Sequence, residues 1–483
     1  MIPLVIIHSY MVHKAETSGF FSRALIPIAI IYFALFFDFF LQEGLVIVRP
    51  VIAGYHGWEK EYLTSTLAIG KFTMMACCPV IAYMSSKFAA HHIFVFGLGC
   101  LIISNLISSF SQSYEVFALA RVAHGISSPS MMLSGMAILT HLSEKTSRGK
   151  YASYGYSGIA HGLLLAPFCL GGLLRGLGQA WTFILLSCLI GANTLAAIVH
   201  FYNVPMFWDK KKSSSSPKDE DKCVDTVSTT SSFHPITGRD VVALFRIILS
   251  NPRMITAVSS CFLVGISIGA NESVLPDILE DFEKDPNYLL SEMHTQLIWT
   301  AGSVSYTIFA VLSGYFADRV SPLKLVIGGM VAFIITYALM AVTCSSLGGI
   351  IAFIALTGGL TSFLDVAAYP LIASVVDTAE IPNAYIIGYS IEYCLEQGAY
   401  AIGQYTGEPL YKAAGKSLAP VAYMVAGVDG SLLALGLFVC FVYPADRFVR
   451  KTTIEEEENR QKNSDIIEDD DHHSKITTID EQI

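Results

Sequence analysis

Runs of apolar residues long enough to cross a lipid bilayer recur along almost the whole chain. A helix needs roughly 20 predominantly apolar residues to span the hydrocarbon core. Of the 483 residues, 53% are hydrophobic and 14% are charged, and the mean hydropathy of +0.54 excludes an ordinary soluble domain. We therefore predict twelve transmembrane helices. Their predicted ranges are 25–48, 64–84, 93–111, 115–139, 150–173, 181–204, 254–276, 295–316, 324–344, 348–376, 384–407 and 418–443.

The predicted helices form two groups of six on either side of a polar segment, 206–252. This segment is rich in serine and lysine and lacks helical periodicity, which predicts a flexible linker. The second helix of each half ends in a similar pattern, at 82–87 and at 314–319, and this internal repeat indicates a duplication. We predict an all-α membrane protein with two pseudo-symmetric six-helix bundles. The predicted boundaries are 1–23 for the N-terminal tail, 24–205 for the first bundle, 206–252 for the linker, 253–445 for the second bundle and 446–483 for a disordered C-terminal tail.

Lysine and arginine residues gather on one side of the predicted bundle. They lie in the loop at 145–150, in the linker, and just after the last helix at 447–451. The positive-inside rule places that side, with both tails, in the cytoplasm. The loop at 277–292 on the opposite side is acidic, either because such loops are poor in lysine and arginine, which we favour, or because it attracts cations. The net charge of −10 comes from the tails and this loop, and we expect no nucleic-acid partner.

Six acidic residues interrupt the apolar runs. Each costs roughly 2.5–3.5 kcal/mol at the centre of a bilayer, so six together require a function. Two basic residues, Lys71 and Arg121, also lie within the runs and balance the acids in part. A cavity with this net negative charge selects cations over anions. The six acids are Asp38, Glu43, Glu272, Asp365, Glu392 and Glu396.

A buried carboxyl group can couple the movement of a cation to that of a proton. Burial destabilises the carboxylate anion, so the group binds a proton readily, whereas an organic ammonium in the same cavity favours the anion. One site then holds either a proton or the cation, and this competition is the coupling of an antiporter. The acids therefore predict exchange of a small organic cation for protons.

Two aspartates are the first candidates for these roles. Asp38 is flanked by phenylalanines, and alkylammonium groups are held by carboxylates and aromatic faces, so we expect it to contact the substrate. An ion pair between Asp38 and Lys71 fits the sequence equally well. We expect Asp365 to be the proton site, because Pro370 lacks an N–H group and loosens the helix enough to admit water. His124 is expected to be a packed, hydrogen-bonded residue rather than a proton relay.

The remaining acids receive less specific roles. Glu392 and Glu396 lie four residues apart and share a helix face, so one of them should be protonated at neutral pH. A contact of either residue with Arg121 or with a water is an equally good interpretation. Glu272 is expected to gate or neutralise the cavity, and Glu43 is left out of the site. The tyrosines expected to line the pocket, unless they only fill the core, are Tyr306, Tyr393 and Tyr400.

Several short motifs resemble those of the major facilitator superfamily. The segment 314–319, Gly-Tyr-Phe-Ala-Asp-Arg, resembles the family's cytoplasmic loop signature, in which the glycine permits close helix contact and the charged pair ties neighbouring helices together. The copy at 82–87 has lost the glycine and the aspartate, and 121–125 resembles the family's Arg-x-x-x-Gly element. The glycine-rich helix around Pro167 is similar to a motif of proton antiporters, although small residues at this spacing favour helix packing. The gating residues that this resemblance implies are Gly314, Asp318 and Arg319.

Within that superfamily the chain resembles the vesicular amine transporters, which load monoamines and acetylcholine into secretory vesicles. The likeness covers about residues 25–443. In that family acidic positions handle protons and the substrate ammonium, and aromatic positions enclose it, which is what the resemblance implies here. The residues that match by position are Asp38, Lys71, Arg121, Glu272, Ser303 to Tyr306, Asp365, Pro370 and Tyr400 to Gly403.

The chain also departs from that family. Phe39 stands where the family commonly has asparagine, and either Glu392 or Tyr393 occupies the position of an eleventh-helix aspartate. The loop at 50–62 carries no glycosylation sequon, unlike the long glycosylated loop of the family. The identity of the substrate therefore does not carry over.

We predict a proton-coupled antiporter that moves an amine-like organic cation by alternating access. The expected location is a secretory, synaptic or endolysosomal vesicle membrane, with the plasma membrane as an alternative. Other candidate functions are a multidrug exporter and a non-transporting receptor or scaffold on the same fold. The pair Ile466-Ile467 resembles an acidic dihydrophobic sorting signal and implies sorting adaptors as partners. We expect no enzyme activity, no metal site, no disulfide framework among the ten cysteines, and no cofactor besides a proton gradient as the energy source.

Overall fold

The structure is a computed structural model that describes residues 19–58, 60–203, 251–284, 292–343, 346–377, 384–415 and 417–442. Throughout these residues the secondary structure is helical, which confirms the predicted all-α class. Most of the linker, residues 1–18 of the predicted N-terminal tail, the C-terminal tail and the pair at 466–467 lie outside the described residues, whereas 19–23 are part of the first helix. The described helices are α2 (Gly19–His56), α3 (Lys60–Ser85), α4 (Ala90–Phe110), α5 (Tyr114–Leu142), α6 (Arg148–Asn203), α8 (Pro252–Lys284), α9 (Glu292–Ala317), α10 (Pro322–Thr343), α11 (Leu347–Asp377), α12 (Ala384–Ala413) and α13 (Ala419–Val442).

The predicted ranges correspond to these helices in order. The ranges 150–173 and 181–204 correspond to the two parts of α6, which are separated at Gly178. This residue has φ 75° and ψ 172°, a left-handed conformation that glycine adopts without strain, so the chain reverses direction there. Among the described residues, eight helices are long and apolar enough to cross a membrane by length and composition. The protein is thus a multi-pass membrane protein, and the count of twelve spans stays a prediction.

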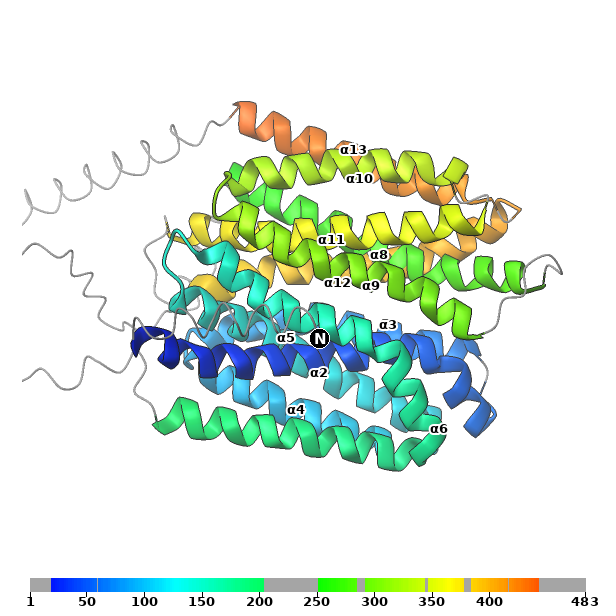
Figure 1. Ribbon diagram of the computed structural model, residues 1–483, viewed down its shortest axis with the longest axis horizontal. Helices are drawn as coiled ribbons and strands as arrows, with labels where there is room; N and C mark the ends of the chain where they lie inside the picture. The colour runs from blue at the N-terminus through cyan, green and yellow to red at the C-terminus, as the bar shows by residue number, and fades with distance from the viewer. Residues whose placement is uncertain are drawn as a thin grey trace, which may run out of the picture.

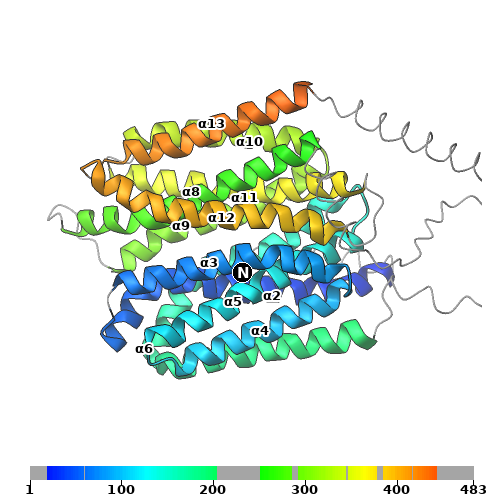
Figure 2. The ribbon, with the colours of Figure 1, turned by 180° about the vertical axis from the view of Figure 1, so that it is seen from behind.

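The helices lie side by side with nearly parallel axes and form two groups. Figure 1 shows α2 to α6, in blue to green, along one side and α8 to α13, in green to orange, along the other; Figure 2 shows the same division from behind. The two groups meet mainly where α6 packs against α9 and α3 packs against α12. Large apolar side chains such as Leu195, Ile308, Leu356 and Phe438 are exposed on the outside, as expected of a surface that faces lipid.

Glycines set how closely the helices pack, and they do so in the same way in both halves. A Cβ atom on Gly162 of α6 would lie 2.6 Å from the Phe36 carbonyl oxygen of α2. In the second half, a Cβ atom on Gly269 of α8 would overlap the Tyr400 carbonyl oxygen of α12. The pairs α2 with α6 and α8 with α12 are therefore equivalent contacts in the two halves, as the internal repeat predicts. Of the glycines around Pro167, Gly158 and Gly162 have the packing role that their spacing favoured, whereas a Cβ on Gly172 would meet nothing within 4 Å.

Candidate functional site

A cavity of about 160 Å³ lies between the two groups of helices. Its walls come from α2, α3, α5 and α6 on one side and from α8, α9, α11 and α12 on the other. Four acidic residues and one basic residue line it, so its formal charge is negative when all are ionised. These residues are Glu43, Glu272, Asp365, Glu396 and Lys71. The aromatic residues in the wall are Phe39, Tyr156, Trp299, Tyr306, Tyr393 and Tyr400.

The cavity wall carries oxygen atoms that lack hydrogen-bond donors. One oxygen of the Asp365 carboxyl, Oδ2, accepts a hydrogen bond of 3.2 Å from the Tyr306 hydroxyl, whereas Oδ1 has no partner. The side-chain oxygens of Asn271 and Gln397 are likewise buried without a partner. Among the described residues that line this cavity, every buried polar side-chain atom without a partner is such an acceptor. The wall therefore suits a ligand that donates hydrogen bonds.

Glu392 lies behind the wall rather than in it. It is buried on α12, one helical turn before Glu396, and its Oε2 has no hydrogen-bond partner. Two carboxylates that close on one helix face repel each other when both are ionised. The alternative that Glu392 or Glu396 contacts Arg121 does not agree with the structure, because the Arg121 guanidinium bonds to other residues.

Asp38 is fully buried in a hydrogen-bond network outside both cavity walls. Its Oδ1 accepts from His124 Nε2 at 2.7 Å, and its Oδ2 accepts from the Ser128 hydroxyl at 2.7 Å and from Gln42 Nε2 at 3.2 Å. An anion with three donors is stable in a buried position without a cationic ligand. In this conformation Asp38 does not line the cavity, although its neighbour Phe39 does, and contact between Asp38 and the substrate stays a prediction.

Arg121 determines how His124 is oriented toward Asp38. A nitrogen of the guanidinium group donates to His124 Nδ1 at 3.0 Å, and another donates to the Ser108 hydroxyl at 3.1 Å. Because arginine has only donors, Nδ1 of the histidine must be the acceptor. The ring proton is therefore on Nε2, which donates the hydrogen bond to Asp38. His124 is thus a packed, hydrogen-bonded residue, as predicted.

Lys71 lies between this network and the cavity. Its Nζ donates to Gln42 Oε1 at 2.8 Å and stands 3.9 Å above the ring of Tyr400. The alternative of a direct ion pair between Asp38 and Lys71 is corrected, since Gln42 bridges the two residues. Tyr400 in turn donates its hydroxyl proton to Glu272.

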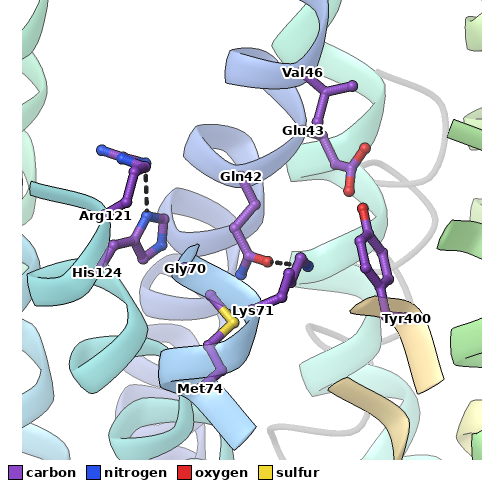
Figure 3. Close-up of a pocket in the computed structure, with 9 residues that line it drawn as sticks. All are labelled: Gln42, Glu43, Val46, Gly70, Lys71, Met74, Arg121, His124 and Tyr400. Carbon is purple, nitrogen blue, oxygen red and sulfur yellow. Dashed lines mark hydrogen bonds between the residues drawn. The ribbon is translucent and has the colours of Figure 1, made fainter. Parts of the chain in front are cut away.

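A second, smaller cavity of about 30 Å³ adjoins the large one and shares Glu43, Lys71 and Tyr400 with it. Figure 3 shows Glu43 pointing at the hydroxyl of Tyr400 and Lys71 reaching toward Gln42. These three side chains line both cavities. Glu43, which the sequence analysis leaves out of the site, therefore lies in the cavity wall.

The two halves are joined at the end that the positive-inside rule assigns to the cytoplasm. Arg148 donates to both carboxylate oxygens of Asp377, at 2.7 and 3.0 Å, and to the Tyr385 hydroxyl at 2.9 Å. Nearby, the hydroxyls of Thr140 and Tyr389 lie 2.7 Å apart. Each of these contacts joins α5 or α6 to α11 or α12, so the cytoplasmic end of the bundle is closed.

The loop signature contributes to this closure through one of its two charges. The Asp318 carboxylate accepts from the backbone N–H groups of Gly149 at 2.8 Å and Lys150 at 3.1 Å, so it caps the first turn of α6 from the other half. Burial raises the pKa of Asp318 above its usual range, although these two N–H groups favour the anion. Gly314 permits the contact, because a Cβ there would lie 2.8 Å from the Gly149 carbonyl oxygen. Arg319 instead stacks 3.5 Å from the ring of Tyr315 in its own segment.

Sequence reasoning missed several of these residues. Glu43 was set aside, but it lies four residues after Phe39, and the two share the cavity-facing side of α2. The neutral acceptors Asn271 and Gln397 carried no charge to draw attention to them. Asp429 on α13 was also overlooked: it is buried away from both cavities, and both its carboxylate oxygens lack a partner.

Comparison with known proteins agrees with the motifs. The family model of the Major Facilitator Superfamily matches residues 28–283 and 258–477. The chromaffin granule amine transporter of Rattus norvegicus is 23% identical over 344 residues. That alignment covers 70% of this chain and 58% of the relative, so the chain spans a little over half of the relative's length.

Proposed function

Because this chain belongs to the major facilitator superfamily and is a membrane transporter, we propose that it exchanges an organic ammonium for protons through the central cavity. The observation that carries the proposal is the set of unpartnered acceptors on Asp365, Asn271 and Gln397. An ammonium group supplies N–H donors and a positive charge, so it satisfies those oxygens and offsets the acids of the wall. The aromatic side chains around them bind alkylammonium groups through their ring faces.

The proton and the cation compete for the same carboxyl groups. Asp365 and Glu396 line the cavity, and Glu392 lies one helical turn from Glu396 behind the wall, so these acids hold fewer charges than carboxyl groups and take up protons. When the ammonium enters, its charge favours release of a proton, and when it leaves, the acids take up protons again. Lys71 limits the negative charge that the cavity can hold without a ligand. Asp38 is a positioning residue that acts through Gln42 on Lys71.

The closed cytoplasmic end supports a transport cycle in which the cavity faces the opposite side in this conformation. A lumen that is more acidic than the cytoplasm supplies about 1.4 kcal/mol per pH unit for each proton exchanged. The relative is named as an amine transporter of chromaffin granules, which supports an amine-like substrate and a vesicle membrane for this chain. Sorting adaptors that bind the tail would direct it there.

Uptake into proteoliposomes tests this proposal. Vesicles with an acid interior and the full-length protein should accumulate a radiolabelled primary amine, and Asp365→Asn should reduce the initial rate at least tenfold. Asp429→Asn is the matched control, since it neutralises an intramembrane acid outside the cavity and should transport at the wild-type rate. Accumulation by Asp365→Asn at the wild-type rate would overturn the proposal.

A multidrug exporter is the second candidate, because six aromatic residues in the cavity wall suit apolar cations. Competition separates the two: a narrow amine site ignores cationic dyes, whereas a multidrug site is blocked by them. A non-transporting scaffold lacks support, since that reading requires a closed cavity or fully paired acids.

A further inference from the structure

Lys71 carries a positive charge in the wall of the acidic cavity without an ion pair. It lies on α3 and borders both cavities, and four carboxyl groups line the larger one. None of the ion pairs among the described residues includes Lys71. Its ammonium group has three N–H donors, and its hydrogen bond goes to a neutral oxygen, Gln42 Oε1, at 2.8 Å. A cation on a flexible side chain therefore stands at the cavity without a carboxylate partner.

The ring of Tyr400 stands where a carboxylate partner would be expected. Lys71 Nζ lies 3.9 Å from the centroid of this ring, close enough for the negative face of the ring to attract the charge. Figure 3 shows the end of Lys71 between Gln42 and the Tyr400 ring. The Tyr400 hydroxyl donates to Glu272, and Glu43 points at the same hydroxyl, so the ring is positioned among acids. An aromatic face, a neutral oxygen and nearby carboxyl groups are what binds an alkylammonium ligand.

We propose that the space over the Tyr400 ring is a second ammonium subsite, which Lys71 fills as a tethered cation in this conformation. The inference rests on the proposed function, in which the acceptors on Asp365, Asn271 and Gln397 bind the first ammonium. While Lys71 fills the second subsite, a further positive charge on the substrate is repelled by the lysine. Lys71 thereby restricts the substrate to a single ammonium group.

The contacts of Gln42 separate this role of Lys71 from a purely structural one. Gln42 Nε2 donates to Asp38 Oδ2 and to the Ser128 hydroxyl, both at 3.2 Å. These hydrogen bonds hold Gln42 in place without the lysine, and Asp38 keeps all three of its donors. Shortening Lys71 therefore opens the space over the ring and leaves the network intact.

Chemical rescue tests whether the subsite exists. Lys71→Ala removes three methylene groups and the ammonium, which together correspond to propylammonium. Thermal midpoints of the full-length protein in detergent are measured against n-propylammonium chloride, with sodium chloride at equal concentrations to correct for screening. The half-maximal concentration of propylammonium should be at least tenfold lower for Lys71→Ala than for the wild type. Lys71→Ser opens the same space and serves where the alanine variant does not fold.

Two control variants sharpen the rescue. Lys324→Ala removes an exposed lysine of α10 outside both cavities and should respond as the wild type does. Lys71→Met removes the charge but keeps the space filled, so it should not gain the tighter response.

The outcomes distinguish the subsite from the proposed function. A response of Lys71→Ala without any response of the wild type leaves the subsite standing and argues against amine binding by the native cavity. Equal half-maximal concentrations in the wild type and Lys71→Ala, or no response in either, would overturn the subsite.

The ring of Tyr400 is tested in the Lys71→Ala background. Tyr400→Phe keeps the aromatic face and should retain the rescue, whereas Tyr400→Leu should raise the half-maximal concentration at least fivefold. An unchanged response with Tyr400→Leu places the bound amine elsewhere and contradicts the subsite.

Substrate selectivity tests the restriction itself. Inhibition of labelled amine uptake into proteoliposomes compares α,ω-diamines, from 1,3-diaminopropane to 1,8-diaminooctane, with monoamines of the same chain length. For at least one chain length, the preference for the diamine over the monoamine should rise at least tenfold from the wild type to Lys71→Ala, and Lys324→Ala should match the wild type. An unchanged preference across the whole series means that Lys71 does not set the charge of the substrate.

Discussion

At the scale of single residues, the buried carboxyl groups differ in how many donors surround them, and that difference separates two roles. Asp38 accepts three hydrogen bonds, so its anion is satisfied by the protein alone. Asp365 accepts one, from Tyr306, and its other oxygen has no partner. The first arrangement holds helices in place, and the second leaves an oxygen ready for a proton or a cation.

Replacing Asp38 with asparagine should therefore destabilise the protein. The asparagine NH₂ group would face another donor, either His124 Nε2–H or the Ser128 hydroxyl. His124 cannot move its proton to Nδ1 to become an acceptor at Nε2, because Arg121 donates a hydrogen bond to Nδ1. We expect a loss of roughly 1–3 kcal/mol, the cost of leaving a buried donor unsatisfied, measured as a lower thermal midpoint in detergent. Asp365→Asn is the contrast: it should lose transport while its thermal midpoint stays at or above that of the wild type. An Asp38→Asn protein as stable as the wild type would contradict this account of the network.

At the scale of helices, Asp318 acts as the N-terminal cap of a helix that belongs to the other half. Its carboxylate receives the Gly149 and Lys150 N–H groups, which have no partner within the first turn of α6. Burial has the larger effect on this group and raises its pKa. Ionised Asp318 is therefore less favourable in the folded state than in the unfolded chain, even though the anion makes the cap.

The raised pKa of Asp318 determines how the stability of the fold depends on pH. The protonated group stabilises the fold fully below the ordinary aspartate range, and this contribution is lost as the pH rises through the raised pKa. Asp318→Asn keeps a capping oxygen without a charge, so its thermal midpoint should not fall with rising pH in that window as the wild type's does. Asp318→Ala removes the cap and should cost about 1 kcal/mol at every pH. Thermal midpoints of the three proteins between pH 4 and 8 decide the matter; parallel curves for wild type and Asp318→Asn would refute the assigned sign.

The sequence was sufficient to locate helices but not to orient them. Predicted ranges match the described helices within several residues, because bilayer thickness sets the length of each apolar run. The rotation of a helix about its axis is not encoded in the same way when all its faces are apolar. For that reason the sequence places Asp38 in the cavity and leaves Glu43 out of the site, whereas the structure has Glu43 in the wall and Asp38 behind it. The Gly178 break was anticipated as a gap between two runs.

At the scale of the whole molecule, two halves of similar construction enclose an acidic cavity, and we propose that they rock against each other during transport. The cytoplasmic ends are joined by Arg148, whose guanidinium binds Asp377 through two nitrogens, and by the Thr140 and Tyr389 hydroxyls. Transport requires that these contacts break and re-form in each cycle. Their strength therefore sets how often the cytoplasmic side is open.

Weakening the contact between Arg148 and Asp377 should shift the protein toward a conformation that is open to the cytoplasm. Hydrogen bonds between charged groups contribute about 1.5–3 kcal/mol, and 1.4 kcal/mol is a tenfold change in an equilibrium, so Arg148→Ala should raise the open population at least tenfold. Arg148→Lys keeps the charge but loses the two-nitrogen geometry. Its open population should lie between those of the wild type and Arg148→Ala. Hydrogen exchange of the segment 140–150 reports the opening without any substrate. The double variant Arg148→Asp with Asp377→Arg, in which the two charges are swapped, should recover part of the protection from hydrogen exchange. If its hydrogen exchange is as fast as that of Arg148→Ala, the ion pair does not control the closure. The Asp318 cap and the contact between the Thr140 and Tyr389 hydroxyls then do.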